Sequence, residues 1–76
     1  MTRRLPALKP REVIRGLQRA GFFVDHVTGS HHILYHPQKP HLRITVAYHG
    51  KDLKPQTLRS IIRQAGLTNE EFLDLL

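Results

Sequence analysis

Two stretches of the chain, residues 9–20 and 55–65, repeat apolar residues at the three- and four-residue spacing of an amphipathic helix. Pro10 suits the first position of the first helix, and Gly21 and Gly66 are placed to end the two helices in a left-handed conformation. The pattern therefore predicts two helices, each with one face for a core. Each apolar stripe has four members: Val13, Ile14, Leu17 and Ala20 in the first helix, and Leu58, Ile61, Ile62 and Ala65 in the second.

Three runs rich in β-branched and aromatic residues lie between the helices and predict strands at residues 22–28, 31–36 and 41–48. Gly29 and Ser30 turn the chain between the first two strands, and residues 37–40 form a four-residue loop before the third. Consecutive strands with short connections favour an antiparallel sheet. Phe22 and Phe23 follow directly on the first helix, so we expect both in the core.

A short third helix is predicted at the C-terminal end, because Thr68 and Glu71 have the spacing of a capping box. The chain is therefore expected to fold as an α+β domain over residues 9–76, preceded by a flexible arm at residues 1–8. Two helices would cover one face of a three-stranded antiparallel sheet, in the order α-β-β-β-α with the short helix added. This is the layout of double-stranded-RNA-binding-like domains.

Strand alternation separates the adjacent histidines His31 and His32. If the loop places His36 opposite His41, one face of the hairpin is apolar and belongs to the core. His31 then lies on this core side, at the edge of the strand. That face carries Ile33, Tyr35, Leu42, Ile44 and Val46. The other, open face carries His32, Leu34, His36, His41, Arg43 and Thr45. A slip of one residue in this register would exchange the two faces.

Charge narrows the classes of partner. The 76 residues include 12 Lys and Arg against 6 Asp and Glu, a formal net charge of +6, and every basic residue precedes Thr68. A basic body of this size suggests a polyanion, most often nucleic acid. Arg11, Arg15 and Arg19 lie on one helix face, either as a solvated surface or as phosphate contacts.

The composition also excludes some classes of site. The chain has no cysteine, which rules out disulfides and cysteine-based zinc sites and fits a cytoplasmic protein. Six histidines raise the question of a metal site, but their spacing along strands does not converge as ligands on one helix face would. No apolar run approaches the ~20 residues of a membrane span, and we see no secretory signal pattern.

Two sequence features together resemble a known family. Gly29-Ser30-His31-His32 opens the second strand, and residues 49–53 lead into the long run at residues 54–67. These features, which span roughly residues 10–76, resemble the HicA family of toxin ribonucleases. The resemblance implies an endoribonuclease that cleaves mRNA without a metal or other cofactor and is held inactive by a HicB-type antitoxin. Ala47 stands where the family commonly has proline, and Gln56 where it commonly has glycine.

The resemblance also implies residue roles. Its catalytic histidine is the fourth residue of the glycine-serine-X-histidine motif, which is His32. A positioned imidazole there would transfer the proton of a 2′-hydroxyl that attacks the adjacent phosphate. Ser30, His36, Arg43 and Lys51 are the candidate RNA-binding residues; Arg43 or Lys51 would stabilise charge on the phosphoryl group. His36 and His49 are candidates for the second acid–base role.

The expected partners are single-stranded mRNA and an acidic, HicB-like antitoxin, with no membrane. The alternative is an RNA-binding module of the same fold without catalysis, because charge and helix pattern would be the same for both.

Overall fold

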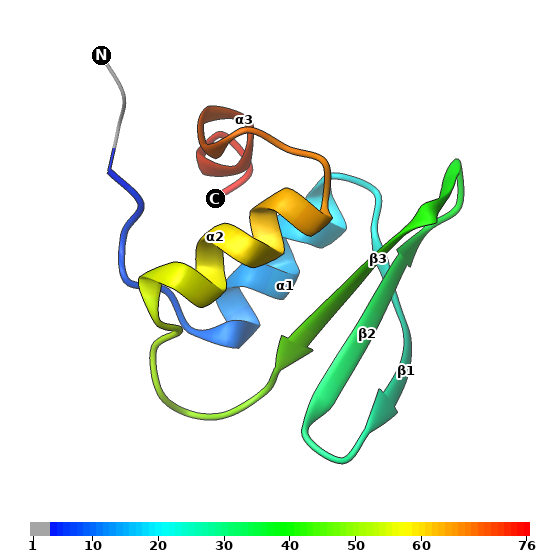
Figure 1. Cartoon of the computed structure of the whole chain (residues 1–76), viewed down its shortest axis with the longest axis horizontal. Coiled ribbons are helices and arrows are strands. Elements are labelled where there is room, and N and C mark those ends of the chain that lie inside the picture. Colours follow the sequence, from blue (N-terminus) through cyan, green and yellow to red (C-terminus); the bar gives the residue numbers. More distant parts are fainter. Residues whose placement is uncertain (1–3) are drawn as a thin grey trace.

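A computed structural model describes residues 4–76. Its elements are α1 (Pro10–Arg19), β1 (Phe23–Thr28), β2 (His31–His36), β3 (Lys39–Ala47), α2 (Pro55–Gln64) and α3 (Asn69–Leu73). The three strands form one antiparallel sheet in the order β1-β2-β3. Both long helices lie on the same side of this sheet (Figure 1). The predicted α+β fold with a short C-terminal helix is confirmed.

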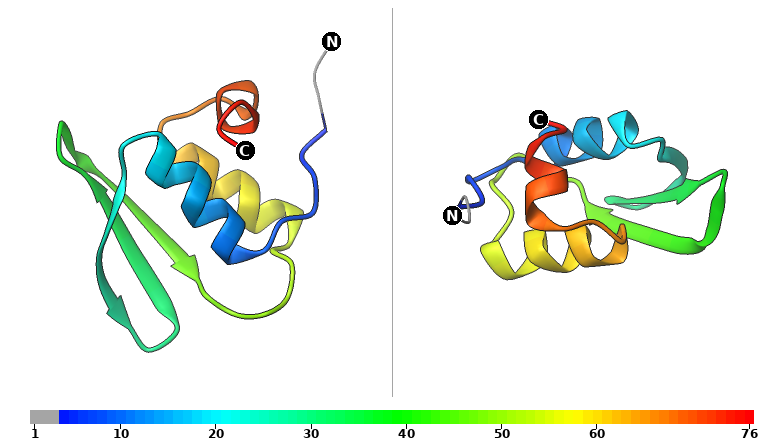
Figure 2. Two further views of the ribbon diagram at one scale, coloured as in Figure 1. Left: turned by 180° about the vertical axis from the view of Figure 1, so that it is seen from behind. Right: turned by 90° about the horizontal axis from the view of Figure 1, so that it is seen from above.

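The core lies between the helices and the sheet face that they cover, which we call the inner face. Helices α1 and α2 lie side by side, and α3 packs across them (Figure 2). Phe72 of α3 is fully buried, and a Cβ atom on Gly16 of α1 would lie 3.3 Å from its ring. The remaining fully or almost fully buried positions include Val13 and Leu17 of α1, Leu34 of β2, Ile44 and Val46 of β3, and Leu58, Ile61 and Ile62 of α2.

The predicted helix ends are confirmed. Gly21 and Gly66 have φ values of +100° and +71°, the left-handed conformation expected after each helix. At the start of α3 the backbone N–H of Glu71 donates to the Thr68 hydroxyl at 3.1 Å, and the Thr68 N–H donates to the Glu71 carboxylate at 2.8 Å. These signals were readable in the sequence because each cap involves residues within a few positions of one another.

The predicted hairpin register between β2 and β3 is wrong by one residue. The chain turns in the two residues Pro37 and Gln38, so that His36 pairs with Lys39 and regular pairing resumes only at Tyr35 with Arg43. The residues of β3 between these two pairs are extra. Pro40 lies among them, and because proline has no N–H to donate, it is found in sheets only at irregular or edge positions.

This shift exchanges the faces of β2 and leaves those of β3 as predicted. Ile44 and Val46 are buried on the inner face, and Arg43 and Thr45 lie on the opposite, outer face. On β2, however, Leu34 is the core residue, with no exposed surface. The side chains of His32 and His36 share its face, and His31, Ile33 and Tyr35 lie on the outer face. The prediction that His32 and His36 belong to the open face is therefore wrong.

Two further expectations need correction. Phe22 is 5% exposed and lies in the core, but Phe23 is 42% exposed on the outer face. In the expected flexible arm, residues 1–3 lie outside the described part. Leu8 is buried, and its carbonyl oxygen accepts a hydrogen bond of 2.8 Å from the Leu53 N–H. The end of the arm is thus fixed to the domain.

Candidate functional site

His32 lies near the end of the sheet where β1 turns into β2. The turn consists of Gly29 and Ser30, and Gly29 has a φ of +59°, as the first central residue of a type II′ turn requires. This end of the sheet extends beyond the two helices (Figure 1). His32 therefore lies on the inner face but is only half-buried, next to the loop that joins β3 to α2.

The imidazole of His32 stacks on the ring of Tyr48. The two ring centroids are 4.4 Å apart, and the planes are inclined by 20°. The backbone N–H of Tyr48 also donates to the carbonyl oxygen of Ser30 at 2.7 Å, so the same turn that begins β2 holds Tyr48 in place. Tyr48 was not among the predicted site residues. It lies two positions after Val46, and only the observed register, which pairs Val46 with His32, brings it to this histidine.

The two ring nitrogens of His32 have different surroundings. Nδ1 is buried and has no hydrogen-bond partner in the protein. That leaves Nε2 as the nitrogen that can reach a ligand. A half-buried imidazole held by a stacked ring and offering one nitrogen is suited to proton transfer, because general acid–base catalysis requires a positioned group.

A groove of about 360 Å³ runs along the loop from β3 to α2, the loop that begins with Tyr48. Ala47 lines it and pairs with His31 on the outer face of the sheet. The predicted RNA-binding residue Lys51 lines the groove together with a second cation, Lys54. The loop is shaped locally, since the Lys51 backbone N–H donates to Nδ1 of His49 at 3.2 Å. His49, a candidate for the second acid–base role, also lines the groove, and Asp52, Leu53 and Thr57 complete the lining.

His36, another predicted RNA-binding residue, is 9% exposed and both of its ring nitrogens are engaged. The backbone N–H of Gln38 donates to Nδ1 at 3.1 Å. Nε2 therefore carries the proton and lies 3.2 Å from the carbonyl oxygen of Ala20. The ring also meets Phe22 edge-on, with centroids 5.0 Å apart. These contacts tie the β2–β3 turn to the end of α1 and leave no nitrogen for a ligand.

The other predicted site residues are not all brought together. Ser30 is exposed in the turn beside His32. Arg43 is exposed on the outer face, three positions along the ladder from His32 and on the opposite side of the sheet. Ser30 thus lies two residues before His32 in the turn, and Lys51 lies in the loop that begins with Tyr48, whereas Arg43 lies on the other side of the sheet.

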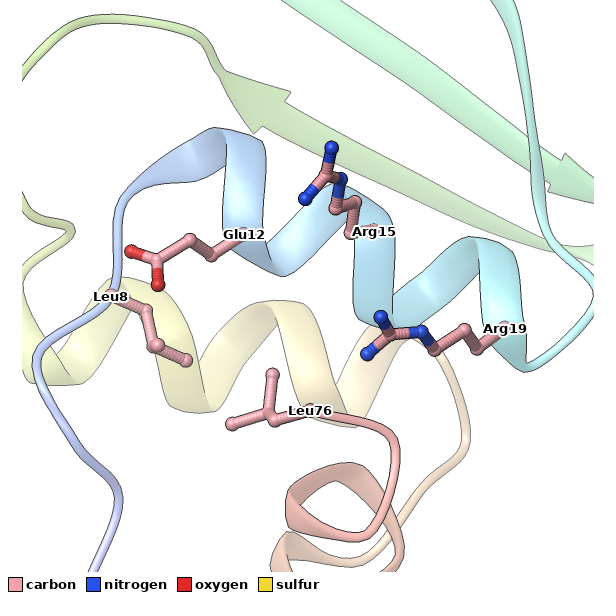
Figure 3. Close-up of a pocket in the computed structure, with 5 residues that line it drawn as sticks. All are labelled: Leu8, Glu12, Arg15, Arg19 and Leu76. Carbon is pink, nitrogen blue, oxygen red and sulfur yellow. The ribbon is translucent and has the colours of Figure 1, made fainter.

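A second pocket, of about 170 Å³, lies along α1 at the C-terminal end of the chain (Figure 3). Glu12, Arg15 and Arg19 line one side of it, with Leu8 and Leu76. Arg19 extends toward the C-terminal segment, where its guanidinium donates to the carbonyl oxygen of Leu75 at 2.6 Å. At least one arginine of the stripe on α1 thus has a structural partner.

Within residues 4–76, no three His, Asp or Glu side chains are grouped so that they could hold a metal ion. No helix in the same part of the chain is long and apolar enough to cross a membrane.

The comparison with known proteins agrees with the family resemblance that the sequence motifs indicated. No curated protein matches the chain. A family model described as the HicA toxin of bacterial toxin–antitoxin systems matches residues 10–67, which include His32, Tyr48 and the Lys51 groove. Because the match covers most of the 76 residues, the chain belongs to the HicA family of toxins from bacterial toxin–antitoxin systems.

Proposed function

We propose that this HicA-family toxin is a metal-independent endoribonuclease that cleaves mRNA, with His32 as the residue that transfers the proton. The observation that carries the proposal is the state of His32. Its ring is held by Tyr48, its Nδ1 is buried, and Nε2 remains for a substrate. Membership of a toxin family supplies the biological setting, since a toxin must damage an essential molecule of its cell.

In the proposed reaction, Nε2 of His32 accepts the proton of a ribose 2′-hydroxyl. The 2′-oxygen forms a bond to the adjacent phosphorus while the bond from phosphorus to the 5′-oxygen breaks, and the leaving oxygen takes a proton from solvent. The products are a 2′,3′-cyclic phosphate and a 5′-hydroxyl end. A positioned acid–base group of this kind contributes roughly 10²–10⁴-fold to the rate.

Lys51 and Lys54 supply the charge that the substrate requires. Both line the groove along the loop that begins with Tyr48, the residue whose ring stacks on His32. Cations placed near a phosphate stabilise the negative charge that develops as the phosphorus is attacked. Arg43 is not assigned this role, because it lies on the other face of the sheet.

The test is cleavage of a long RNA by the purified chain in the presence of EDTA. His32→Ala is expected to abolish cleavage with almost no change in melting temperature, because His32 lies at the end of the sheet and outside the core cluster. His31→Ala, the matched control on the outer face, should remain active. A substrate with 2′-deoxyribose in place of ribose should resist cleavage.

Three results would contradict this proposal: full activity of His32→Ala, cleavage of the deoxyribose substrate, or activity that needs a divalent ion. RNA binding without any cleavage by the wild-type chain would favour the alternative function, an RNA-binding module of the same fold.

A toxin of this family works with an antitoxin. We propose that the partner is an acidic protein resembling HicB that covers His32 and the Lys51 groove. The net charge of +6 supports an acidic partner, because complementary charge speeds association and improves its specificity. Occlusion of His32 would then exclude RNA without any change in the fold of the toxin.

A further inference from the structure

The outer face of the sheet presents an ordered row of planar side chains. Phe23 of β1 pairs with Tyr35 of β2, which in turn pairs with Arg43 of β3. Directly paired residues point to the same face, and neighbouring strands lie about 5 Å apart. Two aromatic rings and one guanidinium therefore stand side by side across all three strands. We call these three residues the outer row.

The outer row is open to solvent. Both long helices lie on the inner side of the sheet (Figures 1 and 2). Phe23 is 42% exposed, Tyr35 is half-buried and Arg43 is exposed. Ile33, at the centre of the same face, is only 4% exposed although it lies outside the core cluster. Neighbouring side chains of the outer face must therefore cover Ile33.

The chemistry of the outer row fits unpaired nucleic-acid bases. Single-stranded RNA is held by stacking of its bases on aromatic side chains and on the guanidinium plane of arginine. We propose that the outer row binds unpaired bases of RNA by stacking, at a site separate from His32. This inference rests on the proposed function, in which RNA is the substrate. It also gives Arg43 a role in RNA binding, although Arg43 lies on the opposite face of the sheet from His32.

Charge and composition favour RNA over a protein partner on this face. Protein interfaces have an apolar centre, and Phe23 is the single large exposed hydrophobic residue among the described positions of the outer face. The carboxylate of Asp25, close to the row, lies 2.8 Å from Nδ1 of His26. Arg43 supplies an exposed cation for a phosphate backbone on this face, in a chain of net charge +6.

The outer row also lies within reach of the proposed catalytic site. Tyr35 and His32 are three residues apart on β2, which corresponds to about 10 Å along the strand. His31 lies on the outer face at the end of the sheet where His32 lies on the inner face. A single strand that stacks on the outer row can pass this end of the sheet and reach His32.

The experiment measures binding of a short unstructured RNA to the wild-type chain and to Phe23→Leu, Tyr35→Leu and Arg43→Lys. The RNA carries 2′-O-methyl groups throughout, so that it cannot be cleaved through its 2′-oxygen. Each change removes a flat surface and keeps apolar bulk or charge. We expect the dissociation constant to rise about fivefold or more for Phe23→Leu, because stacking of one base contributes that much or more to affinity. Arg63→Lys, on an exposed part of α2, is the matched control for Arg43→Lys.

A second ligand separates stacking from charge. The same backbone with abasic sites keeps its phosphates and lacks bases, so Phe23→Leu should bind it as the wild-type chain does. Equal affinity of the wild-type chain and Phe23→Leu for the base-bearing RNA would overturn the proposal. It would also be overturned if Phe23→Leu bound RNA normally but no longer formed the complex with the antitoxin. Should Tyr35→Leu fail to fold, Phe23→Leu carries the test alone, because Phe23 lies outside the core cluster. If the wild-type chain cleaves no RNA but Phe23→Leu still weakens binding, the proposed nuclease function fails and the outer row stands.

Discussion

Replacing His36 with alanine should strongly destabilise the protein while leaving cleavage per folded molecule intact. The imidazole accepts a hydrogen bond from the Gln38 N–H, donates one to the Ala20 carbonyl and packs edge-on against Phe22. Alanine removes all three contacts from a position that is 9% exposed. The turn between β2 and β3 would then lose its connection to the end of α1.

The size of the effect follows from these contacts. Each hydrogen bond contributes about 0.5–1.5 kcal/mol net, and an edge-on aromatic contact a similar amount. Together they predict a decrease of roughly 2–4 kcal/mol in the free energy of unfolding, a large fraction of the total stability of a domain this small. In a domain of 60–100 residues, 1 kcal/mol lowers the melting temperature by about 4–8 °C, so the expected decrease is roughly 10–25 °C.

Thermal and urea denaturation followed by circular dichroism would measure this loss. His36→Asn keeps an acceptor near the position of Nδ1, and His36→Gln keeps a donor near that of Nε2, so each should recover part of the stability. His41→Ala, an exposed histidine of the adjacent β3 segment, is the control and should change little. Wild-type stability of His36→Ala together with lost RNA binding would refute the reasoning and restore His36 as an RNA-binding residue.

Four further outcomes are expected. Tyr48→Phe should cleave RNA like the wild-type chain. Tyr48→Ala should lower kcat about 2–10-fold without a matching change in KM, because the ring that stacks on His32 is lost. An equal kcat for the two variants would exclude a positioning role for Tyr48. Lys51→Gln should weaken RNA binding for all sequences alike and reduce the salt dependence by about one phosphate contact, which a salt titration of affinity measures. Gly21→Ala should destabilise by more than ~1 kcal/mol in urea denaturation, because its φ is +100° and the new Cβ would lie 2.7 Å from Nε2 of His36. In the antitoxin complex, mass spectrometry after diethyl pyrocarbonate treatment should find His32 protected; full reactivity would refute occlusion.

Local patterns in the sequence determined the helices and their ends. The apolar stripes of α1 and α2, the left-handed glycines after them and the capping box of α3 each depend on residues a few positions apart. The inward and outward residues of β3 were also predictable, because alternation along one strand needs no knowledge of its partner. The motif at Gly29–His32 together with the run at residues 54–67 indicated the family, and the residue order of the motif indicated the candidate histidine.

Only the tertiary structure decided which face of β2 carries which side chains. Register depends on the turn and on irregularities in the partner strand, and here the turn at Pro37 and Gln38 with the extra residues around Pro40 shifts the pairing by one. A shift of one residue moves every side chain of a strand to the other face, because the side-chain period is two. His32 thus meets Tyr48, His36 is buried against the end of α1, and Tyr35 joins Phe23 and Arg43 on the outer face. Each of these arrangements brings together residues that are far apart in the sequence.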